Sequence, residues 1–87
     1  MITIAVSTIR PADEYTRPYR IVLRWDQFNS HPYIVQMETD PATAGAAYHN
    51  GDYCTNSLEA FKRLKARAEN AGLEVLFDWD AVNTVTV

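Results

Sequence analysis

The sequence predicts an α+β domain: a mainly antiparallel sheet of four to five strands with one amphipathic helix packed on one face, in the order β-β-β-β-α-β. Short segments in which apolar and polar residues alternate predict the strands, because successive side chains of a strand point to opposite faces. One segment, 57–71, changes to the spacing of a helix. The chain has 87 residues, 47% of them hydrophobic, so we expect residues 1–87 to form a single globular domain with its own core.

The first two strands are predicted at 1–9 and 19–25, separated by a loop at 10–18. In the first segment, isoleucine and valine alternate with threonine, alanine and serine. Two prolines bracket the loop, and proline lacks a backbone donor and restricts the residue before it. The side chains of the second strand that we expect to face the core are Tyr19, Ile21, Leu23 and Trp25.

A third strand, 33–39, follows a turn at 26–32 that contains asparagine, serine and proline. This strand should pair with the second one as an antiparallel hairpin. In that pairing, Glu38 would share the outer face of the sheet with Arg20 and Arg24, and pairs of opposite charge support the register. The face turned away from the helix is then expected to be exposed to solvent, which antiparallel sheets tolerate.

A weaker fourth strand is predicted at 46–53, and it contains Asn50–Gly51. This dipeptide predicts a type I′ turn or a glycine bulge, because both residues tolerate positive φ. Either form would place His49 and Asp52 beside a surface turn. We therefore interpret this segment as one selected for backbone geometry rather than for reactivity.

The helix is expected to begin after Asn56, whose side chain can cap it, with Glu59 completing a capping box. Gly72 should end the helix. A last strand is predicted at 73–80, while the tail 81–87 either extends this strand or returns as a short edge strand. The helix residues expected to face the sheet are Ala60, Phe61, Leu64, Ala68 and Ala71.

Cys54 is the strongest candidate for a catalytic group, because a thiolate is stabilised near a helix N-terminus or a histidine. His49 lies five positions away and no third residue orients it, so a small, buried or half-buried cysteine at a strand end is the preferred interpretation. His31, His49, Asp52 and Cys54 lack the spacing of a metal site. We therefore expect no enzyme activity, no metal and no other cofactor.

Charge is unevenly distributed along the chain, although the net charge is only −3. Residues 26–55 hold no lysine or arginine, whereas the helix 57–71 holds several basic residues. These residues are Lys62, Arg63, Lys65 and Arg67. A nucleic-acid-associated regulator that uses this basic helix is the alternative function. A solvated helix face explains the same residues, and we prefer that explanation because the basic positions spread around the polar arc.

Aromatic side chains in predicted loops and turns exceed what a small core needs and are typical of protein recognition. Together with an acidic segment near the end of the sequence, they predict a small non-enzymatic protein-binding module that occupies the surface of a larger host protein or complex. Short chains of this kind are typical of accessory proteins of phages and other mobile elements, including inhibitors of host defence complexes such as anti-CRISPR proteins. The residues expected to contact the partner are Phe28, Tyr48, Tyr53, Asp78, Trp79 and Asp80.

The cysteine count and the apolar segments bear on the compartment. One cysteine cannot form an intramolecular disulfide, so we expect a reducing, cytoplasmic environment. No segment approaches the roughly 18 consecutive apolar residues of a membrane span, and the N-terminal residues do not resemble a signal peptide, so we expect no membrane partner. The modest core of so short a chain leaves a homodimer open.

Overall fold

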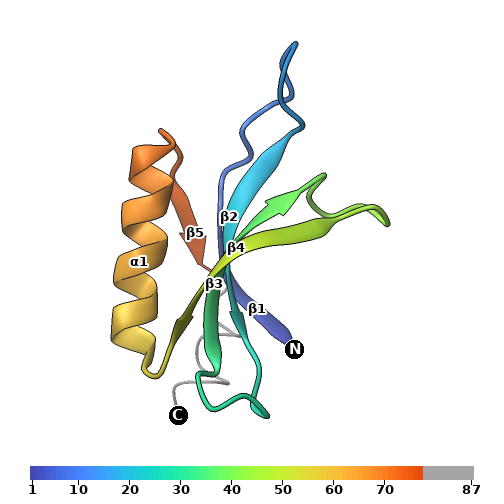
Figure 1. Cartoon of the computed structure of the whole chain (residues 1–87). Helices are drawn as coiled ribbons and strands as arrows, with labels where there is room; N and C mark the ends of the chain where they lie inside the picture. The colour runs from blue at the N-terminus through green and yellow to red at the C-terminus, as the bar shows by residue number, and fades with distance from the viewer. Residues whose placement is uncertain (78–87) are drawn as a thin grey trace.

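In the computed structural model of this chain, residues 1–77 are described, and they form a five-stranded sheet with one helix (Figure 1). The elements follow the order β-β-β-β-α-β, which confirms the predicted α+β fold class. Across the sheet the strands lie in the order β4-β3-β2-β1-β5, and every neighbouring pair is antiparallel. The elements are β1 (Ile2–Ser7), β2 (Tyr19–Trp25), β3 (Tyr33–Thr39), β4 (Ala47–Cys54), α1 (Ser57–Asn70) and β5 (Val75–Phe77).

The helix α1 covers one face of the sheet, where it packs on β2, β3 and β4 and, along its flank, on β5 (Figure 1). Ala60, Leu64 and Ala68 are the buried residues of the helix, as predicted, and two of them are small enough to let the helix approach the sheet closely. The opposite face of the sheet carries no helix in the described part of the chain, and we call it the outer face. The buried core cluster under the helix comprises Ile4, Ala5, Ile21, Leu23, Val35, Cys54, Ala60 and Leu64.

Both ends of α1 are fixed by local hydrogen bonds. At the start, the Asn56 side-chain oxygen accepts from the Glu59 backbone N–H at 2.9 Å, so the predicted N-cap is confirmed. At the end, Gly72 has φ 73°, and the N–H of Leu73 donates to the Ala68 carbonyl at 2.8 Å. This pair of features is a Schellman motif, which satisfies carbonyls that the helix end leaves without partners. Within residues 1–77 no helix is both long and apolar enough to cross a bilayer.

The last described strand is shorter than the predicted one. A strand was expected from residue 73, but β5 begins at Val75 because Leu73 still completes the helix C-terminus. Glu74 then joins the chain to the end of β1: its N–H donates to the Thr8 hydroxyl at 3.1 Å, and its carbonyl accepts from the Thr8 N–H at 2.8 Å. The predicted continuation to residue 80 and the choice for 81–87 lie outside the described residues.

The segment between β1 and β2 is irregular, as its prolines predict, and a carboxylate orders part of it. The Asp13 side chain accepts from the backbone N–H groups of Tyr15 and Thr16, both at 2.8 Å, and from the Thr16 hydroxyl at 2.7 Å. These bonds, the Thr16 hydroxyl first, lower the pKa of Asp13. Tyr15 itself is exposed at this end of the molecule.

Candidate protein-binding surface

Strand β4 contains a bulge at Asn50–Gly51. Opposite Gln36 of β3, β4 holds these two residues in place of one, and Asn50 adopts φ 55°. The pairs on either side are Val35 with Asp52 and Met37 with His49. Of the two predicted forms, the glycine bulge is therefore confirmed and the type I′ turn is wrong, because β4 continues through the dipeptide as one strand.

The bulge decides which β4 side chains share a face. In a regular strand, the side chains of residues five positions apart point to opposite faces. One extra residue between them, as in a bulge, places both side chains on the same face. Tyr48 and Tyr53 therefore both lie on the outer face, opposite Glu38 and Ile34 of β3. Both tyrosines lie within the predicted strand 46–53, where they were expected beside a surface turn, and the structure corrects the turn by placing them on one continuous strand.

Arg67 of α1 holds the bulge from the helix side. Its Nη1 donates to the backbone carbonyls of Val35 at 2.9 Å and Asn50 at 2.8 Å, and it lies 3.3 Å from an Asp52 carboxylate oxygen. Backbone groups beside a bulge lose regular ladder partners, and these bonds satisfy two of them. The sequence pattern grouped Arg67 with the solvated helix face and gave no sign of this role.

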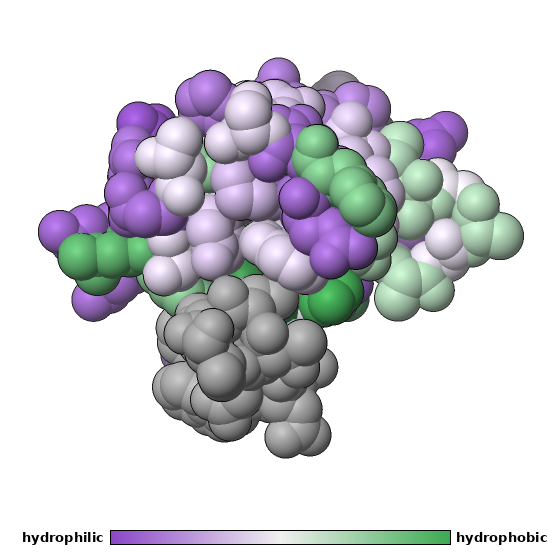
Figure 2. Space-filling model, turned by 90° about the horizontal axis from the view of Figure 1, so that it is seen from below, coloured by the Kyte–Doolittle hydropathy of each residue, from purple (hydrophilic) through white to green (hydrophobic). Residues whose placement is uncertain are grey.

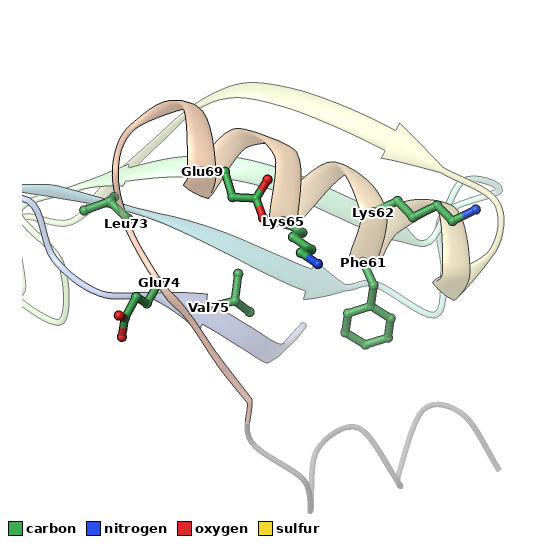
Figure 3. Close-up of a pocket in the computed structure, with 7 residues that line it drawn as sticks. All are labelled: Phe61, Lys62, Lys65, Glu69, Leu73, Glu74 and Val75. Carbon is green, nitrogen blue, oxygen red and sulfur yellow. The ribbon is translucent and has the colours of Figure 1, made fainter.

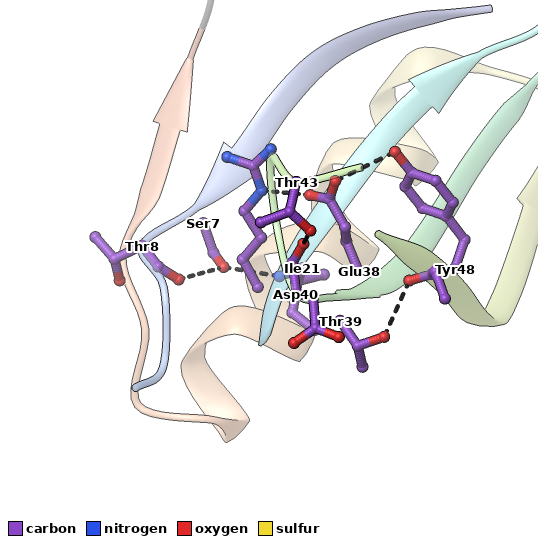
Figure 4. Close-up of polar contacts among 10 residues, drawn as sticks. Ser7, Thr8, Ile21, Glu38, Thr39, Asp40, Thr43 and Tyr48 are labelled. Atoms are coloured by element: carbon purple, nitrogen blue, oxygen red, sulfur yellow. Dashed lines mark hydrogen bonds and ion pairs between the residues drawn. The ribbon is translucent and has the colours of Figure 1, made fainter. Parts of the chain in front are cut away.

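A buried carboxylate organises the outer face. Glu38 is 3% exposed, and its carboxylate lies 2.5 Å from Arg20 Nε. The Tyr48 hydroxyl donates to the second Glu38 oxygen at 3.2 Å (Figure 4). The Arg24 guanidinium lies over the Tyr48 ring, 3.9 Å from its centroid. The predicted cross-strand pairing of Glu38 with a basic residue is thus confirmed, and the network that fixes Tyr48 goes beyond it.

The centre of the outer face is less exposed than expected. Val22 and Ile34 point to this face and are buried together with Glu38, although no helix of the described chain covers them. They are flanked in register by long side chains: Gln36 opposes Val22, and Tyr53 opposes Ile34. Long side chains that lie over the strands shield such positions from water. The expected solvent exposure of this face is therefore confirmed at Tyr48 and Tyr53 and wrong at Val22, Ile34 and Glu38.

The structure brings together some of the predicted contact residues and separates others. Tyr53 is 55% exposed on the outer face, beside the partly exposed Tyr48. Phe28 is 90% exposed in the β2–β3 turn, where it borders a separate hollow of about 320 Å³ near Trp25. Seen from the turn end, apolar residues form several patches separated by polar ones (Figure 2). The remaining predicted residues, Asp78, Trp79 and Asp80, lie outside the described residues.

Comparison with protein-family models, with curated proteins and with solved structures finds no match for this chain. The interpretation of the outer face therefore rests on its own geometry. Two arginines, Arg20 and Arg24, belong to this surface, although the sequence pattern indicated them only as support for strand pairing. The signal that could have identified them is their spacing: both lie on the same face of β2 as a buried glutamate on the neighbouring strand.

The candidate reactive groups do not form one site. Cys54 is 2% exposed within the core, and burial, followed by the nearby Glu59 carboxylate, raises the pKa of its thiol. The His49 ring lies 3.2 Å from the Thr39 hydroxyl, whereas the Asp52 carboxylate faces arginines of α1. Within residues 1–77, no three histidine, cysteine or acidic side chains are grouped as metal ligands.

Alkylation of Cys54 tests this placement. A buried neutral thiol reacts slowly, so we expect iodoacetamide to label the native protein at least about tenfold more slowly than the urea-unfolded chain at the same pH. The raised thiol pKa also means that the thiol contribution to stability is complete below its unfolded pKa and is lost as pH rises through the folded value. The unfolding free energy of the Cys54→Ala variant should not show this decrease at alkaline pH. Equal labelling rates in both states would instead indicate an accessible thiolate.

The basic helix is partly committed to internal contacts. Arg67 donates into the bulge, and Arg63 pairs with Glu59 at 3.3 Å and with Asp52 at 3.8 Å. Lys62 and Lys65 form no ion pair within the described residues. Two lysines do not make the row of phosphate contacts on which nucleic-acid affinity depends, so no observation favours the nucleic-acid alternative.

Proposed function

We propose that this protein is a non-enzymatic protein-binding module whose outer face contacts the partner. The observation that carries the proposal is the position of Tyr48 and Tyr53 together on the outer face, which no helix of residues 1–77 covers, with Tyr48 fixed by Glu38 and Arg24. Tyrosine and arginine are enriched at the energetic centres of protein interfaces, whereas lysine and glutamate are depleted.

Preorganisation supports the same function. A side chain that must be immobilised on binding costs roughly 0.5–1.5 kcal/mol of affinity. Tyr48 is already held by its hydroxyl bond to Glu38 and by the stacked Arg24 guanidinium. Tyr53 adds a ring with few rotatable bonds and more than half of its surface exposed. The outer face therefore offers contact area at a low entropic cost.

Within this proposal, the partner is a larger host protein or complex, and the module acts by occupying part of its surface. Occupation of a functional surface inhibits the partner, which is the mode of action of phage-encoded inhibitors of host defence complexes. An anti-CRISPR-like role is thus the specific form of the proposal, and it is motivated by the size and the motif-free character of the chain.

Affinity capture with matched tyrosine variants tests the proposal. The immobilised full chain is expected to retain one stoichiometric protein from a lysate of source cells. The Tyr53→Ser variant should weaken that complex by about 2 kcal/mol, the loss expected for a tyrosine at the centre of an interface. Tyr15→Ser is the control, because Tyr15 is equally aromatic and highly exposed but lies in the loop between β1 and β2.

Three outcomes would argue against the outer face. The first is retention of no protein at all, and the second is equal loss of affinity in the Tyr15→Ser and Tyr53→Ser variants. The third is a loss confined to Phe28→Ser, which would move the interface to the β2–β3 turn. Circular dichroism of each variant separates lost binding from lost folding.

A further inference from the structure

A concave surface lies between α1 and β5, away from the outer face. It has a volume of about 550 Å³, within the usual range of ligand sites. Its apolar residues are Phe61, Leu73 and Val75 (Figure 3). Lys62 and Lys65 of α1 also line it. We call this surface the flank groove.

The flank groove is lined by basic and acidic side chains as well as apolar ones. Lys62 and Lys65 lie one helical turn apart near Phe61, and neither forms an ion pair within residues 1–77. Glu69 lies one helical turn beyond Lys65 on α1, and Glu74 lines the groove near Leu73, where in Figure 3 its carboxylate points away from the helix. A bound segment therefore meets an apolar floor beside Lys62 and Lys65, with the Glu69 carboxylate one helical turn farther along α1.

The position of β5 favours an extended peptide as the occupant. β5 is the edge strand beside β1, and within the described chain no further strand pairs with its other side. Backbone groups on such an edge can hydrogen-bond an added strand, while alternate side chains of that strand enter neighbouring pockets. The groove floor at Val75 belongs to this same strand.

The geometry points to the flank groove as a docking site for an extended peptide segment of a partner protein, in which an apolar side chain fills the groove and an adjacent carboxylate meets Lys62 and Lys65. The inference goes beyond the proposed outer-face function and does not depend on it, because no residue is shared between the two surfaces. A nucleic acid fits the groove less well, since two lysines do not make a row of phosphate contacts and Phe61 alone among the described lining residues offers a ring on which a base stacks.

Fluorescence anisotropy with short labelled peptides and the full-length protein tests this site. A peptide that alternates leucine and aspartate is expected to bind saturably and to weaken as salt is added. A double variant, Lys62→Glu with Lys65→Glu, should lower the affinity about fivefold or more. Replacing both lysines with arginine should keep the affinity within about twofold, because the charge is preserved. Tyr53→Ser should leave binding unchanged and keeps this test separate from that of the outer face.

Amide chemical shifts locate the peptide independently of the variants. Shifts that change at Leu73, Glu74 and Val75 on titration would place it in the flank groove, whereas shifts confined to β4 would overturn the inference. Equal binding of a serine–aspartate peptide would also overturn it, because charge alone would then suffice. So would an undiminished affinity in the charge-reversed variant with native circular dichroism, or displacement of the peptide by a single-stranded oligonucleotide at lower concentration.

Discussion

The Arg20→Met variant is expected to lose about 2–3 kcal/mol of unfolding free energy. Removing one partner of a buried pair leaves the other charge without compensation, which costs about 3–5 kcal/mol when the pair is fully buried. The Glu38 side chain is 5% exposed and the Arg20 side chain 20%, so the pair is not fully buried and a loss just below that range is expected. Methionine keeps an apolar stem of similar length, and the loss therefore reports the guanidinium rather than the packing.

A double variant distinguishes the lost charge from a lost contact. Replacing Glu38 as well as Arg20 with methionine removes the buried carboxylate, so most of the lost stability should return. Urea unfolding followed by circular dichroism measures both variants. If Arg20→Met unfolds at the wild-type midpoint, or if the double variant is no more stable than the single one, the account of the outer face as organised by a buried Glu38 is wrong.

Deletion of Gly51 is expected to be at least as damaging, with a loss of about 3 kcal/mol or more. The deletion removes the extra residue of the bulge, so one part of β4 must turn its side chains to the opposite face. Either Tyr48 would leave Glu38 and Arg24, or Cys54 would leave the core. Arg67 would also lose the arrangement of carbonyls that it binds in the bulge.

The matched control keeps the bulge and changes only its side chain. Asn50 adopts φ 55°, a conformation that glycine adopts without strain, so Asn50→Gly should change stability by less than about 0.5 kcal/mol. Differential scanning calorimetry of the two variants provides the comparison. A Gly51 deletion that unfolds at the wild-type temperature would show that β4 tolerates either register and that the bulge does not position the tyrosines.

Much of the fold could be predicted because its signals are local. Asn56 and Gly72 mark the helix ends through bonds to residues within one turn, and alternation within each segment identified the strands. The Asn50–Gly51 dipeptide is compatible with a type I′ turn and with a glycine bulge, because each of these forms needs residues that tolerate positive φ. The choice between them depends on β3 and on Arg67, which are distant in sequence. Local pattern alone could not decide it.

The sequence predicted which kinds of residue are exposed on the binding surface better than it predicted where on the molecule they lie. Tyr53 and Phe28 are exposed aromatics, as expected, but they lie on different parts of the molecule. Tyr48 shares a face with Tyr53 only because of the bulge. The alternation of a regular strand would place the two tyrosines on opposite faces, so the sequence did not indicate that they lie together. The role of Glu38 as a buried centre depends on three side chains from two neighbouring strands, which no single segment of sequence indicates.

Hydrogen–deuterium exchange of the protein with and without its captured partner tests the central claim most directly. If the outer face is the interface, amide exchange should slow over Ala47–Cys54, the edge strand that carries both tyrosines, by about tenfold or more at saturating partner. Exchange in the loop around Tyr15 should stay unchanged. Protection confined to α1 and β5, with β4 exchanging at its free rate, would contradict the assignment of the partner to the outer face.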